Sequence, residues 1–82
     1  MSVYLVITPY MNNGFFGTYS TVKRARIAFE NFLAQDENIV SVENLDDYCY
    51  SFRTKIGEEF GAEIVWDCVD AEFVEGVVKE ED

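Results

Sequence analysis

Histidine is absent from this 82-residue sequence, proline occurs once, cysteine twice, and lysine and arginine together only 6 times. Without histidine the chain lacks the side chain that most often acts as an acid–base catalyst or a metal ligand near neutral pH. Cys49 and Cys68 form neither a zinc-ligand spacing nor a C-x-x-C motif. We therefore expect no enzyme activity, no cofactor and no metal site.

The shortage of basic residues leaves the chain strongly acidic. Its 16 Asp and Glu residues give a formal net charge of −10, and 10 of them lie within residues 58–82. A surface of this sign repels nucleic acid and anionic membranes. No stretch is long and apolar enough to cross a bilayer, and the N-terminus does not resemble a cleavable signal. We expect neither nucleic acid nor a membrane as a direct partner.

Apolar residues are plentiful, at 49% of the sequence, and their spacing predicts the fold. The strongest pattern lies in residues 47–69, where apolar side chains alternate along two arms. These are Tyr48, Tyr50 and Phe52 in the first arm, and Phe60, Ala62, Ile64, Trp66 and Cys68 in the second. A period of two places each set on one face of a β-strand, so we expect a long hairpin with both sets in the core.

The loop between the two arms determines whether their faces agree. A three-residue loop at residues 55–57 sets Phe52 opposite Phe60 on one face and Arg53 opposite Glu59 on the other. Such a loop ends on a residue in the left-handed conformation, and Gly57 stands at that position. The sequence therefore predicts this register.

The other elements are predicted from shorter patterns. In chain order they are a central strand at 2–10, an Asn-Gly turn at 13–14, a short strand at 15–19, a helix from Ser20 or Thr21 to Gln35, a strand from Ile39, and a helical turn at 71–76 capped by Asp70 and ended by Gly76. The helix carries an apolar stripe formed by Val22, Ala25, Ala28, Phe29, Phe32 and Leu33.

These elements predict one α+β domain. We expect a two-layer sandwich with one amphipathic helix on a mainly antiparallel sheet of four to five strands, in the order β-β-α-β-β-β. The domain should cover residues 1–78, with residues 79–82 as a frayed acidic tail.

Two groups of residues could carry chemistry, and we expect neither to do so. Lys23, Arg24 and Arg26 lie in the first turns of the helix, where cations oppose the helix dipole. We expect them to pair with the abundant carboxylates of the chain. The predicted register sets Cys49 opposite Glu63, and a neighbouring carboxylate raises the pKa of a thiol and so disfavours a nucleophile.

We expect a protein-binding or self-associating module. One helix covers only one face of a sheet, so apolar residues on the other face would form a partner or dimer surface. The candidate residues for this surface are Tyr4, Val6, Val65 and Val69.

The alternative is an acidic nucleic-acid mimic that occupies the binding surface of a basic DNA- or RNA-binding protein. Its carboxylates would be Glu59, Glu63, Asp67, Asp70, Glu72 and Glu75. Residues four apart on a strand are separated by about 13 Å, which is sparser than the phosphates of a duplex.

The layout of residues 3–45, an Asn-Gly hairpin followed by a Ser-capped helix and a further strand, is similar to that of many short phage and large-virus proteins. The resemblance implies a viral or phage accessory protein. We expect a cytoplasmic location, which for a viral protein is the host cytoplasm or the virion.

Overall fold

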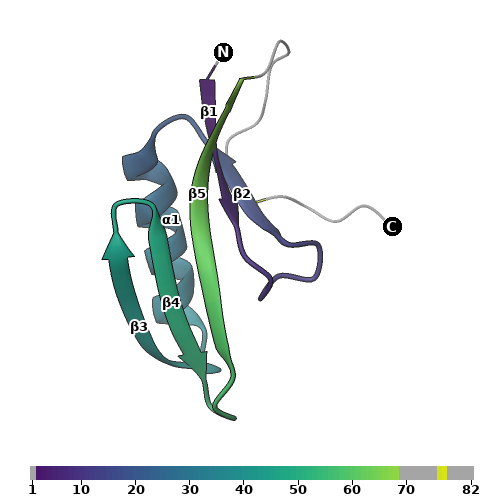
Figure 1. Cartoon of the computed structure of the whole chain (residues 1–82), viewed down its shortest axis with the longest axis vertical. Helices are drawn as coiled ribbons and strands as arrows, with labels where there is room; N and C mark the ends of the chain where they lie inside the picture. The colour runs from purple at the N-terminus through teal and green to yellow at the C-terminus, as the bar shows by residue number, and fades with distance from the viewer. Residues whose placement is uncertain (1, 69–75, 78–82) are drawn as a thin grey trace.

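The computed structural model describes residues 2–68 and 76–77. Within them the elements are β1 (Ser2–Ile7), β2 (Phe15–Tyr19), α1 (Val22–Gln35), β3 (Ile39–Asp46), β4 (Cys49–Thr54), β5 (Glu59–Cys68) and β6 (Gly76–Val77). The strands form one antiparallel sheet in the order β3-β4-β5-β1-β2-β6, and α1 packs against one face of it (Figure 1). The predicted α+β sandwich is confirmed, with the two-residue β6 added at one edge.

The register of the β4–β5 hairpin is the predicted one. Phe52 lies opposite Phe60, and Arg53 lies opposite Glu59 and forms an ion pair with it. The Thr54 N–H donates to the Glu58 carbonyl over 2.9 Å, which closes the three-residue loop. Gly57 has a φ of +86°, so it occupies the left-handed conformation that the loop requires.

The first hairpin also follows the sequence pattern. β1 is a central strand between β5 and β2, and it ends at Ile7, two residues before Pro9. The turn into β2 contains Gly14 with a φ of +76°. The Asn13 side-chain oxygen accepts a hydrogen bond from the Phe15 N–H over 3.0 Å and supports the turn.

The helix begins at Val22, and Thr21 is its N-cap, because the Thr21 hydroxyl accepts a hydrogen bond from the Arg24 N–H over 3.1 Å. Its stripe buries Ala25, Phe29 and Leu33 against the sheet. Phe29 is the centre of an aromatic cluster, with ring centroids 5.1 Å from Phe16 and 5.4 Å from Tyr50. The stripe is therefore part of the core, as predicted.

The prediction that Tyr4 and Val6 of β1 lie on the sheet face away from the helix is wrong. Val6 is 0% exposed and packs in the core beneath α1, and Tyr4 on the same face is half-buried against that core. Val65 lies opposite Leu5, on the face away from the helix. Both faces of β1 are apolar, so alternation could not show which one the helix covers.

The placement of Tyr48, Trp66 and Cys68 in the core is also wrong. Tyr48 lies in the turn before β4 and is 50% exposed, Trp66 is 60% exposed, and Cys68 is exposed. Trp66 and Cys68 share a face with the buried Ile64, but they lie near the end of β5. This end of the sheet extends beyond the start of α1 (Figure 1). The alternation along β5 is regular. Trp66 and Cys68 are exposed because α1 does not cover this end of the sheet.

We expect Trp66→Ala to lower the free energy of unfolding by only about 1 kcal/mol, because most of this side chain is already in solvent. Ile64→Ala, two residues earlier on the same face, should cost about 2–5 kcal/mol, because Ile64 is buried. Denaturant unfolding of both variants checks this. Equal losses would show that Trp66 is buried.

Several predicted features lie wholly or partly outside the described residues. These are the helical turn at 71–76, the tail at 79–82, and the candidate site residues Val69, Asp70, Glu72 and Glu75. Gly76, predicted as a helix stop, belongs to β6. Among the described residues there is no helix long and apolar enough to cross a membrane.

Candidate protein-binding surface

Among β1 to β5, the most exposed strand is β3. It has 8 residues, and every one after Ile39 is exposed. Three of them are large and aliphatic, with exposures of 59% for Val40, 48% for Val42 and 57% for Leu45. The strand is the outermost one, so its backbone pairs with β4 alone. Such an edge exposes a row of backbone groups that another strand can pair with.

The hydrogen-bond alternation shows which groups of β3 face outward. The Thr54 N–H donates to the carbonyl of Glu58, the residue just before β5, so the next residues of β4 whose backbone groups point toward β5 are Phe52 and Tyr50. The backbone N–H and C=O groups of Arg53 and Ser51 therefore point toward β3, where these residues pair with Ser41 and Glu43. The N–H and C=O groups of the alternating residues Val42 and Asn44 are left on the free edge.

The two edges of the sheet differ. At the other edge, the described residues of β6, Gly76 and Val77, pair with Thr18 and Gly17 of β2, so the backbone of β2 is covered there. β3 contains neither lysine nor proline, the residues that often protect a longer edge. Its pairing with β4 shifts register at Val40 and again at Leu45, which leaves Ser41 to Asn44 as a regular segment.

Arg26 fixes one end of β3 to the helix. Its guanidinium donates to the Asn44 side-chain oxygen over 2.7 Å and to Asp47 over 3.2 Å. Its Nε atom donates to the Tyr50 hydroxyl over 3.2 Å, and that hydroxyl donates to Glu30 over 2.6 Å. The expected pairing of a helix cation with nearby carboxylates is confirmed for Arg26, and it holds the β3 edge in a defined position.

The same network shifts two pKa values. The hydrogen bond to Tyr50 and the nearby carboxylates raise the pKa of Arg26, so its guanidinium stays positively charged. Burial raises the pKa of Tyr50, and its hydrogen bond to Glu30 adds to the effect. Tyr50 therefore stays protonated and keeps its donor at neutral pH.

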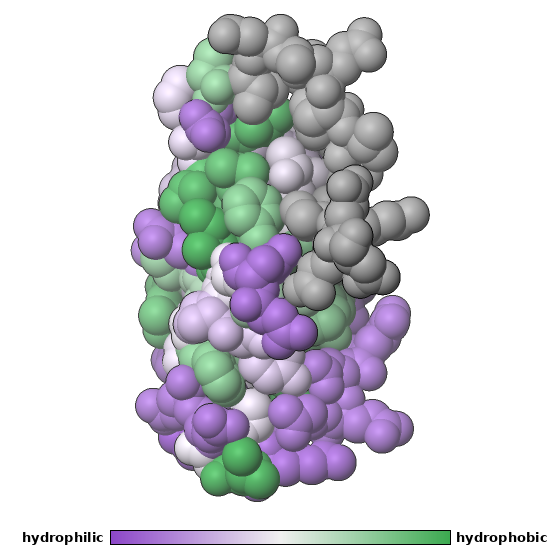
Figure 2. All heavy atoms as spheres, turned by 90° about the vertical axis from the view of Figure 1, so that its right-hand side faces the viewer, coloured by the Kyte–Doolittle hydropathy of each residue, from purple (hydrophilic) through white to green (hydrophobic). Residues whose placement is uncertain are grey.

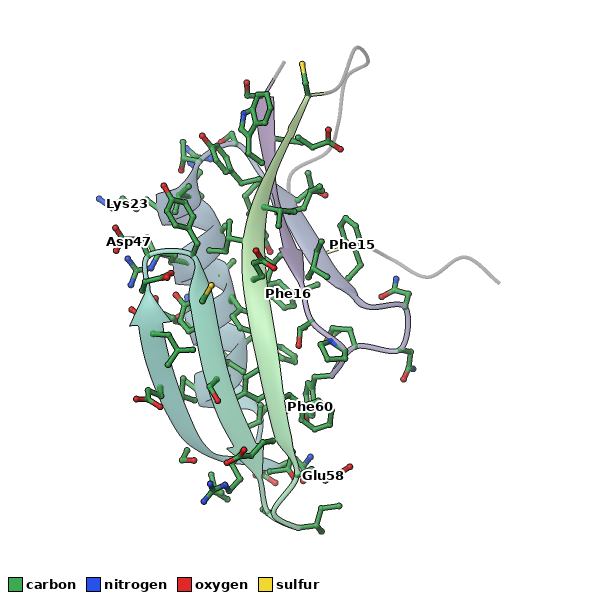
Figure 3. All side chains as sticks on the ribbon, in the orientation of Figure 1. Phe15, Phe16, Lys23, Asp47, Glu58 and Phe60 are labelled. Atoms are coloured by element: carbon green, nitrogen blue, oxygen red, sulfur yellow. The ribbon has the colours of Figure 1, made fainter. Side chains whose placement is uncertain are left out.

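A cleft of about 420 Å³ lies between α1 and the turn from β3 to β4. Lys23 on α1 and Asp47 on the turn lie at the same end of the molecule (Figure 3). The apolar part of the lining includes Ile27 and Tyr48, which are 52% and 50% exposed. Because Asp47 directly follows β3, the cleft continues the exposed surface of that strand.

The sheet face away from α1 is divided between apolar and acidic residues. Leu5 and Val65 are half-buried there and Ile7 is 40% exposed. On the side of the molecule that includes the β2 edge, hydrophobic residues gather in the upper part and hydrophilic residues in the lower part (Figure 2). Of the candidate partner residues Tyr4, Val6 and Val65, only Val65 lies on the sheet face away from α1.

The described part of the candidate acidic surface lies together. Glu59, Glu63 and Asp67 are exposed and share the face of β5 that points away from the helix. Arg53 pairs with Glu59 and offsets its charge.

The Cys49 thiol is not activated. Cys49 lies opposite Glu63, as predicted, and its pKa is raised by burial and then by Asp46 and Glu63. Both cysteines are free thiols. Within residues 2–68 and 76–77, no group of three or more Asp, Glu or Cys side chains is arranged to hold a metal.

Sequence reasoning missed β3 as a functional candidate. The alternation of Val40 and Val42 indicated a strand, and nothing local indicated that it would be the outermost one. Comparison of the chain with protein families, curated proteins and solved structures gives no match.

Proposed function

We propose that this protein is a non-enzymatic protein-binding module that accepts an extended segment of its partner along β3. The observation that carries the proposal is the open β3 edge, where the backbone groups of Val42 and Asn44 face outward beside exposed aliphatic side chains. On the opposite side of the sheet, β2 is covered by β6 at Gly17 and Thr18.

Strand addition uses features that this edge already has. The backbone of a partner would pair with Val42 and Asn44, and every second side chain of the partner would contact this surface and determine specificity. Val42 lies opposite Phe52, so it extends the helix-facing side of the sheet and offers apolar area to the partner. Since Arg26 already holds this edge against α1, little conformational entropy is lost when the partner binds.

The chemistry of the described residues supports a role without catalysis. The raised pKa of Cys49 keeps its thiol protonated near neutral pH. A binding function needs only the shape, the hydrogen-bonding groups and the charge of the surface.

Val42→Pro tests the proposal directly. Proline lacks the N–H that Val42 points toward the free edge, and it removes no hydrogen bond to β4. Peptides would be selected from a random displayed library on the parent protein and then measured against the variant. We expect them to bind Val42→Pro at least about tenfold more weakly, because the pairing of the edge is interrupted.

Ser41→Pro is the matched control for the fold. The Ser41 N–H points toward β4, so its loss should lower the midpoint of thermal unfolding, whereas Val42→Pro should melt close to the parent. A Val42→Pro protein that melts normally and binds the selected peptides as tightly as the parent would contradict strand addition.

The acidic nucleic-acid mimic is the second candidate function. The observation that favours it is the exposed row of Glu59, Glu63 and Asp67 on one face of β5. The ion pair between Arg53 and Glu59 weakens this row at one end. Duplex DNA should displace a basic partner from this face, and it should not displace an uncharged peptide that pairs with β3.

A further inference from the structure

We infer that the segment accepted by β3 is an antiparallel strand that alternates apolar residues with lysine or arginine. This inference rests on the proposed function and specifies the partner. It follows from the charges along the edge and from the register that the outward-facing backbone groups impose.

The charges along β3 are all negative. The strand contains Glu43 and Asp46 and no basic residue, and Asp47 follows it directly. The two neighbouring arginines already have carboxylate partners, Arg26 with Asp47 and Glu30, and Arg53 with Glu59. Within the part of the chain that the structure describes, Glu43 forms no ion pair. Its charge is therefore available to a partner.

The register places a basic side chain of the partner next to Glu43. In an antiparallel pair, the residue that exchanges hydrogen bonds with Val42 points its side chain to the same face as Val42. That face is the helix-facing side of the sheet and favours an apolar residue. The next residue of the partner stands opposite Glu43 in a non-hydrogen-bonded pair, in which the Cα atoms are only about 4.5 Å apart. A lysine or arginine there forms a close cross-strand ion pair.

The outer face has room for such a side chain. A groove of about 270 Å³ runs beside Glu43 and is lined mostly by polar residues, which include Ser41, Ser51 and Glu59. Arg53 also lines the groove and already neutralises Glu59, so a long basic side chain that lies at the β3 end of this groove places its charge next to Glu43.

A second copy of the chain fits this edge less well. In the antiparallel register that pairs Val42 of one β3 with Asn44 of another, Glu43 of one copy would stand directly opposite Glu43 of the other. Each copy also carries a formal net charge of −10, which opposes association. A strand with basic residues would bring positive charge to this negatively charged edge, so we infer that the partner is a different protein.

The test uses three peptides of 8 residues, the length of β3, in which valine alternates with lysine, threonine or glutamate. Binding of each labelled peptide is measured by fluorescence anisotropy. For the parent protein we expect the lysine peptide to bind at least about threefold more tightly than the threonine peptide, and the glutamate peptide to bind most weakly. Glu43→Lys should reverse this order.

Glu63→Lys is the matched control. It makes the same change in net charge on the same outer face, but on β5, two strands away from the free edge. We expect it to keep the order of the three peptides, because the lysines of the partner do not reach Glu63. Equal effects of the two variants would show only general attraction to an acidic protein and would overturn the inference.

The arms of the test separate the inference from the proposed function. If the lysine and threonine peptides bind equally, and both are lost in Val42→Pro, the basic partner is wrong and strand addition stands. If peptides bind equally to the parent and to Val42→Pro, strand addition itself is wrong. A dimer of the parent that is seen by sedimentation and is lost in Val42→Pro would assign the edge to a second copy and overturn the basic partner.

Discussion

Phe29→Ala should lower the free energy of unfolding by about 3–5 kcal/mol, the largest loss that we expect from a single core substitution. Phe29 is 0% exposed, and its ring contacts the rings of Phe16, Tyr50 and Phe52 from β2 and β4. Removing it opens a cavity between the helix and the sheet. Domains of this kind are stable by only about 5–15 kcal/mol, so much of the total stability depends on this one side chain.

Urea unfolding, followed by circular dichroism, measures the change. Ile27→Ala is the matched control, because it also replaces a large residue of α1 by alanine at a position that is 52% exposed. We expect Ile27→Ala to cost less than about 1 kcal/mol. If the two variants unfolded at the same urea concentration, the helix would not pack on the sheet through Phe29.

Gly57→Val should destabilise the protein by about 1–3 kcal/mol through backbone strain alone. Gly57 has a φ of +86°, which a β-branched residue adopts only at a high energetic cost. A Cβ atom at this position would meet nothing within 4 Å, so a steric clash does not contribute. Thermal or urea unfolding measures the loss.

Two controls separate this strain from a general intolerance of the hairpin to substitution. Gly57→Asn should recover part of the loss, because asparagine tolerates the left-handed conformation better than valine. Gly61→Ala lies in the same hairpin, has no positive φ, and places its Cβ 3.7 Å from the Tyr50 carbonyl oxygen, an ordinary contact. It should change the stability by less than about 1 kcal/mol. A Gly57→Val protein as stable as the parent would mean that the loop has another conformation.

The proposals for function rest on a difference between the two edges of one sheet. Proteins usually protect a free edge because unpaired strands lead to aggregation. β3 is protected only by its two register shifts and by its negative charge. Both features permit pairing over the regular segment from Ser41 to Asn44 with a partner of the right charge. We propose that this edge disfavours pairing with copies of itself and accepts a basic strand, which would combine solubility with selective binding.

Much of this fold was predictable because its signals are local. The three-residue loop that ends on Gly57, the facing pairs Phe52–Phe60 and Arg53–Glu59, and the apolar stripe that contains Phe29 each depend on residues near one another in the chain. Alternation with a period of two identifies a strand, and spacing with a period of 3.6 identifies a helix. The same hairpin register placed Cys49 opposite Glu63. Burial is the larger cause of the raised pKa of this thiol, and the Glu63 carboxylate contributes to it.

The sequence by itself thus determined the elements from β1 to β5, the hairpin register and the acidic, histidine-free chemistry of the chain. The tertiary structure decided which face of β1 the helix covers, so that Val6 is buried and Val65 is on the opposite face. It also decided that Trp66 lies beyond the helix and that β3 is the open edge of the sheet. The physical reason is that alternation shows only that a strand has two faces. Which face is covered, and which strand is outermost, depends on pairing between segments far apart in the chain.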